Sequence, residues 1–142
     1  MIIKKIAAGV LAATAVAVAA PAAAHADTDT GFALCDTRAC DNNFVMGKIT
    51  WHNRTATVSG HVVDSGPGFT VAKFRAYANG KQIGKEVSRY TDDASTNPDL
   101  KSPRALGFGL GDTNLPGGID KIAIFLCFTE TTCQYSMTVP KP

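Results

Sequence analysis

The sequence predicts an all-β fold: a small disulfide-containing β-sandwich of about seven or eight strands, immunoglobulin-like or with a related Greek-key arrangement. Three observations predict it. Short runs of alternating apolar and polar residues follow one another between turn signals. No segment of the sequence has a convincing helical period, and the four cysteines form two closely spaced pairs.

The first 26 residues have the three-part organisation of an export signal. A pair of lysines precedes an apolar run, and Ala24-His25-Ala26 supplies a small-x-small cleavage site. We therefore expect residues 1–26 to be a secretion signal peptide and residues 27–142 to be a single β-sandwich domain in the extracellular space. Retention at the cell surface by an uncleaved signal is the alternative, although Pro21 interrupts the alanine-rich run.

The net charge of the expected mature chain, and the way its charged residues are distributed, limit the kinds of partner that it can bind. Residues 1–26 contain two of the 14 Lys and Arg and none of the 12 Asp and Glu, so the expected mature chain has no net charge. Its basic residues are scattered singly among acids, which is typical of a solvated surface and differs from the basic footprint of a nucleic-acid binder. We expect no nucleic-acid partner, and no membrane partner once the signal is cleaved.

The cysteines are Cys35, Cys40, Cys127 and Cys133. An even number in a small exported domain indicates two disulfides, whereas a zinc site would need a closer spacing and usually histidine. Three pairings are open. The short spacings favour Cys35–Cys40 and Cys127–Cys133, because each pair then closes a tight loop.

The elements follow in order from residue 27. Residues 27–31 are polar and are expected to be frayed. Residues 32–35 and 40–46 are expected to form two short strands joined by a turn.

Residues 46–65 contain two alternating runs joined by Asn53-Arg54, which predicts an antiparallel hairpin. A two-residue turn places Trp51 opposite Ala56. The core face of this hairpin then carries Ile49, Trp51, Ala56, Val58 and Val62, and its solvent face carries Lys48, Thr50, His52, Thr55, Thr57, Ser59 and His61.

A second hairpin is predicted over residues 69–90, around the strong type I′ turn signal Asn79-Gly80. Its expected cross-strand pairs are Ala76 with Ile83, Lys73 with Glu86, and Ala72 with Val87. Lys85 then falls on the core face, so Gly84 beside it is expected to mark a bulge that turns the lysine outward.

Residues 91–103 lack apolar periodicity and predict a loop long enough to be a functional candidate, with a plain crossover between the sheets as the alternative. Its acids Asp92, Asp93 and Asp99 are candidate binding residues, although they lack the spacing of a calcium loop.

The glycine-rich run at residues 105–111 predicts a strand with Leu106, Phe108 and Leu110 on one side and a bare side made by its glycines. A dinucleotide loop is excluded because the following residues start no helix. We expect an internal neighbour against the glycines, either the Trp51 hairpin or the 91–103 segment, and an exposed flat groove is the alternative.

Residues 119–128 are apolar on both faces, which predicts a central strand buried on both sides. If Cys127 faces Cys133, the pairs Phe125 with Tyr135 and Ala123 with Met137 follow. Between the two cysteines lies the candidate binding loop Phe128, Thr129, Glu130, Thr131 and Thr132.

The sequence predicts no catalytic residue, metal site or cofactor. His52 and His61 lie on one solvent face about 20 Å apart at ~3.3 Å per residue, so they cannot share a metal or a proton.

In its size, export signal and two local disulfides on a predicted sandwich, the chain resembles the neocarzinostatin-type chromoprotein carriers. These are exported bacterial proteins whose immunoglobulin-like fold shelters a small enediyne. The resemblance covers architecture and transfers no ligand-binding residue. It implies a small-molecule carrier with a cleft between its sheets. Trp51 is a candidate aromatic wall for such a cleft, and core packing is the alternative for this residue.

The sequence thus favours a secreted, non-enzymatic binding or interaction protein, inhibitors of extracellular enzymes included, whose partner is an extracellular protein or a small molecule. The carrier is the second hypothesis. A secreted enzyme or an envelope protein is the third, and a cluster of either histidine with an acid and a Ser or Thr inside one pocket would favour the enzyme.

Overall fold

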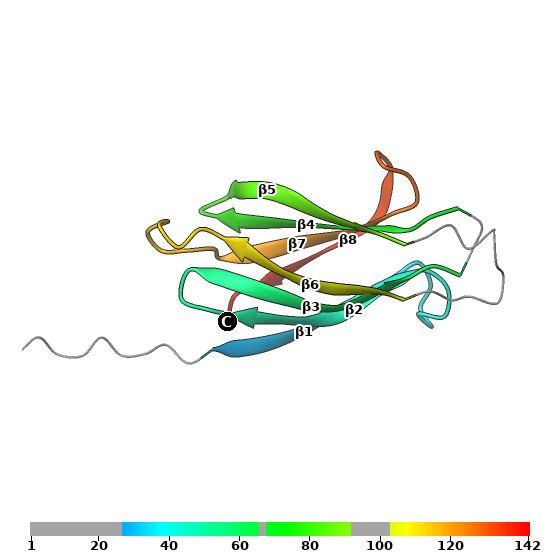
Figure 1. The fold of residues 1–142 in the computed structure, drawn as a ribbon, viewed down its shortest axis with the longest axis horizontal. Helices are drawn as coiled ribbons and strands as arrows, with labels where there is room; N and C mark the ends of the chain where they lie inside the picture. The colour runs from blue at the N-terminus through cyan, green and yellow to red at the C-terminus, as the bar shows by residue number, and fades with distance from the viewer. Residues whose placement is uncertain (1–26, 66–67, 92–102) are drawn as a thin grey trace, which may run out of the picture.

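The computed structural model describes residues 27–65, 68–91 and 103–142, which form eight antiparallel strands in two four-stranded sheets (Figure 1). We call them sheet A, in the order β1-β2-β3-β6, and sheet B, in the order β5-β4-β7-β8. The strands are β1 (Thr28–Cys35), β2 (Phe44–Trp51), β3 (Thr55–Val63), β4 (Val71–Ala78), β5 (Lys81–Tyr90), β6 (Arg104–Gly111), β7 (Lys121–Cys127) and β8 (Cys133–Pro140). The sheets pack as a sandwich, so the predicted fold class is confirmed.

The predicted signal peptide, residues 1–26, lies outside the described residues. Within the part of the chain that the structure describes, no helix has the length and apolar character needed to cross a membrane.

The strands are connected as a Greek key. Edge strands β5 and β6 contact each other along one side of the sandwich. Following the strands around that side gives the order β3-β6-β5-β4, in which three consecutive strands lie beside the one that precedes them. An immunoglobulin sheet pairs its first, second, fifth and fourth strands, so this sandwich is the related Greek key rather than the immunoglobulin order.

The first predicted hairpin is confirmed in register and in facing. Trp51 pairs with Ala56, and Ile49 pairs with Val58. All five predicted core positions are buried, namely Ile49, Trp51, Ala56, Val58 and Val62. Phe74 of β4 meets them from sheet B, with its ring edge-on to the rings of Phe32 and Phe108.

Strand β1 begins earlier than the sequence predicts. Residues 28–31 pair with β2 along their length, so the expectation that they are frayed is wrong. Asp29 accepts hydrogen bonds from Lys48 at 2.8 Å and from Thr50 at 2.6 Å. The Trp51 indole donates to Thr30 at 3.0 Å. Bonds from the neighbouring strand thus hold a polar segment in which Asp29 and Gly31 disfavour a strand.

The second hairpin forms at Asn79-Gly80, but its register shifts within the strands. Ala76 pairs with Ile83 as predicted, whereas Phe74 pairs with Val87. A bulge in β5 accounts for the shift, since Gly84 has a φ of 70° and Lys85 is exposed. The bulge and the outward lysine are confirmed.

Two predicted pairs beyond this bulge are therefore wrong. Lys73 lies opposite Ser88 instead of Glu86, and Ala72 lies opposite Arg89 instead of Val87. The physical reason is that the bulge adds two residues to β5, which displaces every later pair. Lys73 still reaches Glu86 with an N···O distance of 3.5 Å, because its long side chain spans the offset.

The last hairpin also differs by a bulge. Cys127 lies opposite Cys133, but the register shifts between Leu126 and Cys127. Phe125 therefore pairs with Ser136, not Tyr135, and Ala123 pairs with Thr138, not Met137. Strand β7 is a central strand of sheet B, as predicted, and Ile122, Ile124 and Leu126 on its inner face are fully buried. The prediction that β7 is buried on both sides is wrong for Lys121 and Phe125, which are only partly buried because they lie on the outer face of the sandwich.

The glycines of β6 do not share one environment. A Cβ at Gly111 would lie 3.0 Å from the Arg54 carbonyl, so this glycine packs against the Trp51 hairpin, as expected. A Cβ at Gly107 would meet nothing within 4 Å, and one at Gly109 would meet only the Ala56 carbonyl at 3.9 Å. The Trp51 hairpin therefore does not pack closely against these two glycines, since β6 is an edge strand and both glycines are exposed. The other expected neighbour, the 91–103 segment, lies outside the described residues except at its two ends.

Candidate functional site

Both disulfides lie at the same end of the sandwich. They join Cys35 to Cys40 and Cys127 to Cys133, which confirms the favoured pairing. The bridges close residues 36–39 and 128–132. The loops that contain these residues, 36–43 and 128–132, appear in cyan and orange at the end of Figure 1 away from the C-terminus. We call this end, with these two loops, the disulfide-loop end.

The 128–132 loop is held by its own backbone and by sheet B. The Thr129 hydroxyl accepts a hydrogen bond from the Thr132 amide at 2.8 Å. Lys73 of β4 donates to the Glu130 carbonyl at 2.6 Å. The candidate residues from Thr129 to Thr132 are exposed, so the loop presents them in a fixed conformation.

Phe128 differs from the other candidate loop residues. It is partly buried and packs against the core. Its ring lies edge-on to Tyr135, with the centroids 6.1 Å apart. Phe128 therefore anchors the loop, and the side chains available to a partner are those of the four residues that follow. The other predicted candidates, Asp92, Asp93 and Asp99, lie outside the described residues.

Tyr90 was missed by the sequence analysis. Its side chain is 43% exposed, and among the described residues no other large hydrophobic side chain is exposed to this extent. It ends β5 in the same cross-strand row as Val71 and Cys127, so it belongs to the disulfide-loop end. The Phe69 ring supports it, with the centroids 6.1 Å apart. Two features could have pointed to Tyr90: its place at the end of a strand and the nearby aromatic Phe69. Neither can be recognised before the register of β5 is known.

A buried polar cluster fastens the chain beneath this end. Thr70 and Thr91 exchange backbone and side-chain hydrogen bonds at 2.9 to 3.2 Å, and Thr91 also donates to the Asp64 carboxylate at 3.3 Å. All three residues are buried. They tie the β3–β4 connection to the end of β5, which fixes the base from which Tyr90 projects.

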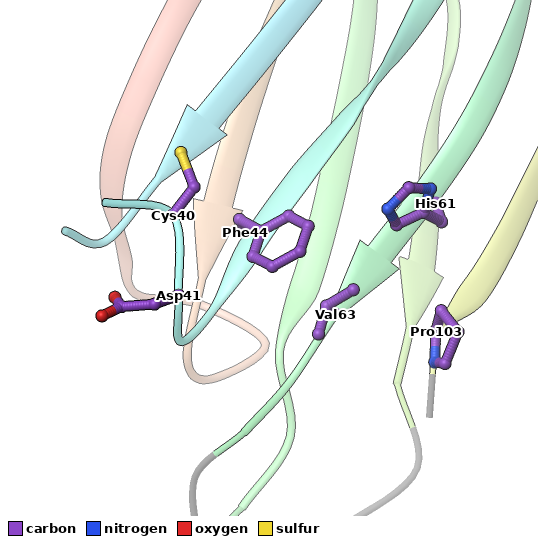
Figure 2. A pocket seen from close by; sticks show the side chains of 6 residues that line it. All are labelled: Cys40, Asp41, Phe44, His61, Val63 and Pro103. Carbon is purple, nitrogen blue, oxygen red and sulfur yellow. The ribbon is translucent and has the colours of Figure 1, made fainter. Parts of the chain in front are cut away.

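A pocket of about 400 Å³ opens on the outer side of sheet A at this end. Figure 2 shows Phe44, His61, Val63 and Pro103 around it, with the carboxylate of Asp41 turned away from the Phe44 ring. Phe44 and His61 meet edge to face with ring centroids 5.9 Å apart. Cys40 and Asp41 complete the lining, in which apolar surface and one imidazole suit a small ligand.

Trp51 is fully enclosed, with an exposed fraction of 2%. Packing in the core therefore accounts for Trp51, and its ring does not form an exposed aromatic wall.

The two histidines of the described chain lie far apart on sheet A, as predicted. His61 takes part in the pocket, whereas His52 bonds to two side chains. Its Nδ1 lies 2.9 Å from Asp27 Oδ1, and its Nε2 lies 2.9 Å from Thr57 Oγ1. The sequence analysis missed this trio because Asp27 is 25 residues away and reaches His52 only when β1 begins early.

The outer face of sheet B carries a charged group. Arg75 donates to Glu86 at 2.6 Å and also lies 4.7 Å from the centroid of the Phe125 ring. Partial burial works to raise the pKa of Glu86, but the hydrogen bond and charge of Arg75, together with Lys73, outweigh it and leave that pKa below its ordinary value.

The outer face of sheet A has a more exposed counterpart. Hydrogen bonds from Lys48, and then from Thr50, hold the pKa of Asp29 below its ordinary value. Across the described residues no group of three or more His, Cys, Asp or Glu side chains is arranged to hold a metal ion. No family model, curated protein or solved structure matches the chain.

Proposed function

We propose that this protein is a secreted binding module that presents its disulfide-loop end to an extracellular protein partner. The observation that carries the proposal is the coincidence of the exposed Tyr90 with both disulfide-closed loops at one end of the sandwich. Tyrosine is enriched among the residues that dominate binding energy, because it offers a large contact area with few rotatable bonds.

The placement of the disulfides supports a role in presentation. Each bridge spans only five or six residues, so it stabilises the fold by about 2 kcal/mol, less than a bridge between distant strands would. A short bridge mainly fixes its own loop. A loop that is already ordered loses less conformational entropy when it binds, which is an advantage for an inhibitor or another tight binder.

The experiment is affinity capture from the growth medium of the source organism, with purified protein on the resin. We expect Tyr90→Ala, and separately the double variant Glu130→Ala with Thr131→Ala, to lose the partners that the unaltered protein retains. Phe128 is left intact because it anchors the loop.

The matched control is Tyr77→Ala. Tyr77 is the same residue type, lies on the same sheet, and pairs with Lys121 near the opposite end. Retention of every specific partner by the Tyr90→Ala and loop variants would overturn the proposal. Equal loss in the Tyr77→Ala variant would instead indicate a general effect on folding.

The pocket favours a second candidate function, that of a small-molecule carrier. Its volume of about 400 Å³ lies within the range of ligand pockets, and Phe44 with His61 supplies an apolar wall and one polar group. Native mass spectrometry of the protein purified from its source should show an added mass that His61→Ala removes and Tyr90→Ala leaves. Absence of any added mass from repeated preparations would count against the carrier.

A further inference from the structure

The trio of Asp27, His52 and Thr57 has the connectivity of an activated nucleophile. The carboxylate of Asp27 can only accept a hydrogen bond, so the Nδ1 atom of His52 donates to it. A neutral imidazole has one N–H, which leaves Nε2 with its lone pair directed at the Thr57 hydroxyl, 2.9 Å away. Acid, imidazole and hydroxyl thus stand in the order that nucleophilic catalysis uses.

We propose that Thr57 is a covalent modification site that takes an acyl group from activated acyl donors, such as aryl esters or thioesters. In this step the Thr57 hydroxyl gives its proton to Nε2 while Oγ forms a bond to the carbonyl carbon of the donor. The bond from that carbon to the leaving group breaks, and Nε2 returns the proton to the departing oxygen or sulfur. The products are an acyl-threonine and a phenol or thiol, with nothing oxidised or reduced.

The surface beside Thr57 has room for the acyl group. Thr57 is exposed on β3, and its neighbour in β6 is Gly109. Among the described residues, a Cβ at Gly109 would meet only the Ala56 carbonyl, at 3.9 Å, and a Cβ at Gly107 beyond it would meet nothing within 4 Å. The bare side of β6 therefore leaves a shelf against the hydroxyl.

The backbone pairing of sheet A limits the reaction to activated acyl donors. Around Thr57, β3 is paired with β2 on one side and with β6 on the other. Its backbone N–H groups belong to those ladders, so β3 offers no pair of donors to an oxyanion. A general base alone contributes about 10²- to 10⁴-fold, which suffices for good leaving groups and favours a single modification over turnover.

The test is reaction of the intact protein with p-nitrophenyl acetate, followed by mapping of the acetyl group on peptides. We expect acetylation of Thr57 at a rate about 100-fold above that of Thr55 and Ser59, which lie on the same face of the same strand. Thr57→Val should remove the early release of p-nitrophenol, and Thr57→Ser should retain it. His52→Gln should slow acetylation of Thr57 about 100-fold, whereas His61→Gln should not change it.

Two further measurements distinguish an ester on Thr57 from other acetylated groups, and a positioning role of Asp27 from a structural one. Hydroxylamine removes an acetyl ester from threonine but leaves amides on lysine or an amino terminus. Asp27 acts as a positioning residue, so Asp27→Ala should change the tautomer of His52 in nitrogen NMR as well as the acetylation rate. Equal acetylation of Thr57, Thr55 and Ser59, or an unchanged rate in His52→Gln, would overturn the proposal and leave the trio as a fastening of β1.

Discussion

The two sheets reach a similar size by different means. Sheet A pairs β1, β2, β3 and β6 without a register shift, whereas sheet B has one shift between β4 and β5 and another between β7 and β8. The outer face of sheet A carries several hydroxyl side chains, among them Thr50, Thr55, Thr57 and Ser59. The outer face of sheet B sets cations on aromatic rings, as with Arg75 on Phe125 and Lys121 on Tyr77.

The two sheets fix the register of their strands in different ways. In sheet A, β2 and β3 meet so closely at Gly47 and Gly60 that the regular register depends on two missing side chains. In sheet B, bulges accommodate paired strands of unequal residue number, and long side chains such as Lys73 reach across the resulting offsets in register. Sheet A should therefore be sensitive to the addition of single atoms, and sheet B to the removal of charges and disulfides.

The largest expected effect comes from filling the close approach in sheet A. A Cβ at Gly47 would lie 2.0 Å from the Ser59 carbonyl, and a Cβ at Gly60 would lie 2.1 Å from the Met46 carbonyl. Gly60 also has a φ of 145°, which strains any side chain. We expect Gly60→Ala to lower the free energy of unfolding by about 3 kcal/mol or more, measured by denaturant titration.

The matched control for that prediction is Gly107→Ala. A methyl group there meets nothing within 4 Å, so its effect should be within about 0.5 kcal/mol. Similar losses in the two variants would show that sheet A does not depend on the close approach.

The second prediction compares the two disulfides. Replacing Cys127 and Cys133 with alanine should destabilise the protein by about 2–3 kcal/mol, whereas replacing Cys35 and Cys40 should remove about 2 kcal/mol or less. The ring sizes are nearly equal, but Cys127 is fully buried and leaves a cavity. Thermal unfolding of both double variants measures the difference, and a larger loss at the Cys35–Cys40 bridge would reverse this ranking.

The third prediction concerns acid stability. The folded pKa of Glu86 and that of Asp29 both lie below their ordinary values. Each carboxylate therefore adds stability that is present above its unfolded pKa, about 4, and is lost as pH falls through the folded pKa. We expect Glu86→Gln to remove about 1 kcal/mol at pH 7 and to flatten the acid limb of the stability curve.

The comparison with Asp29 tests the contrast between the sheets. The Asp29 side chain is 52% exposed against 25% for Glu86, so solvent screens its interactions more, and Asp29→Asn should change the acid limb less than Glu86→Gln. Denaturant titrations from pH 2 to pH 7 compare the two variants. A larger effect at Asp29 would mean that the exposed pair on sheet A contributes more than the partly buried group on sheet B.

Sheet A could be predicted from the sequence more fully than sheet B. Alternation and a two-residue turn were enough for the hairpin at Asn53-Arg54, since neither strand contains an insertion. Around Asn79-Gly80 the same reasoning located the turn and the bulge at Gly84, but periodicity could not give the number of residues that the bulge adds.

The candidate site was predictable only in part, for a related reason. The disulfide pairs are local in sequence and were favoured correctly. The Asp27 contact with His52 and the pocket between Phe44 and His61 require that separate strands be aligned first. Tyr90 reads as an ordinary strand residue until the bulge in β5 sets its row beside Cys127.

The smallest expected effect lies at the exposed glycines of β6. Gly109→Val adds a β-branched side chain where the nearest atom is 3.9 Å from the new Cβ, so we expect a change within about 0.5 kcal/mol. Gly111→Val is the matched contrast, since Gly111 has a φ of 100° and a Cβ there would lie 3.0 Å from the Arg54 carbonyl, and it should destabilise the protein by about 2 kcal/mol or more. Denaturant titration measures both variants. Equal losses would mean that the outer side of β6 is covered, whereas intact folding of Gly109→Val with slower acetylation of Thr57 would identify that side as the shelf that the acyl group occupies.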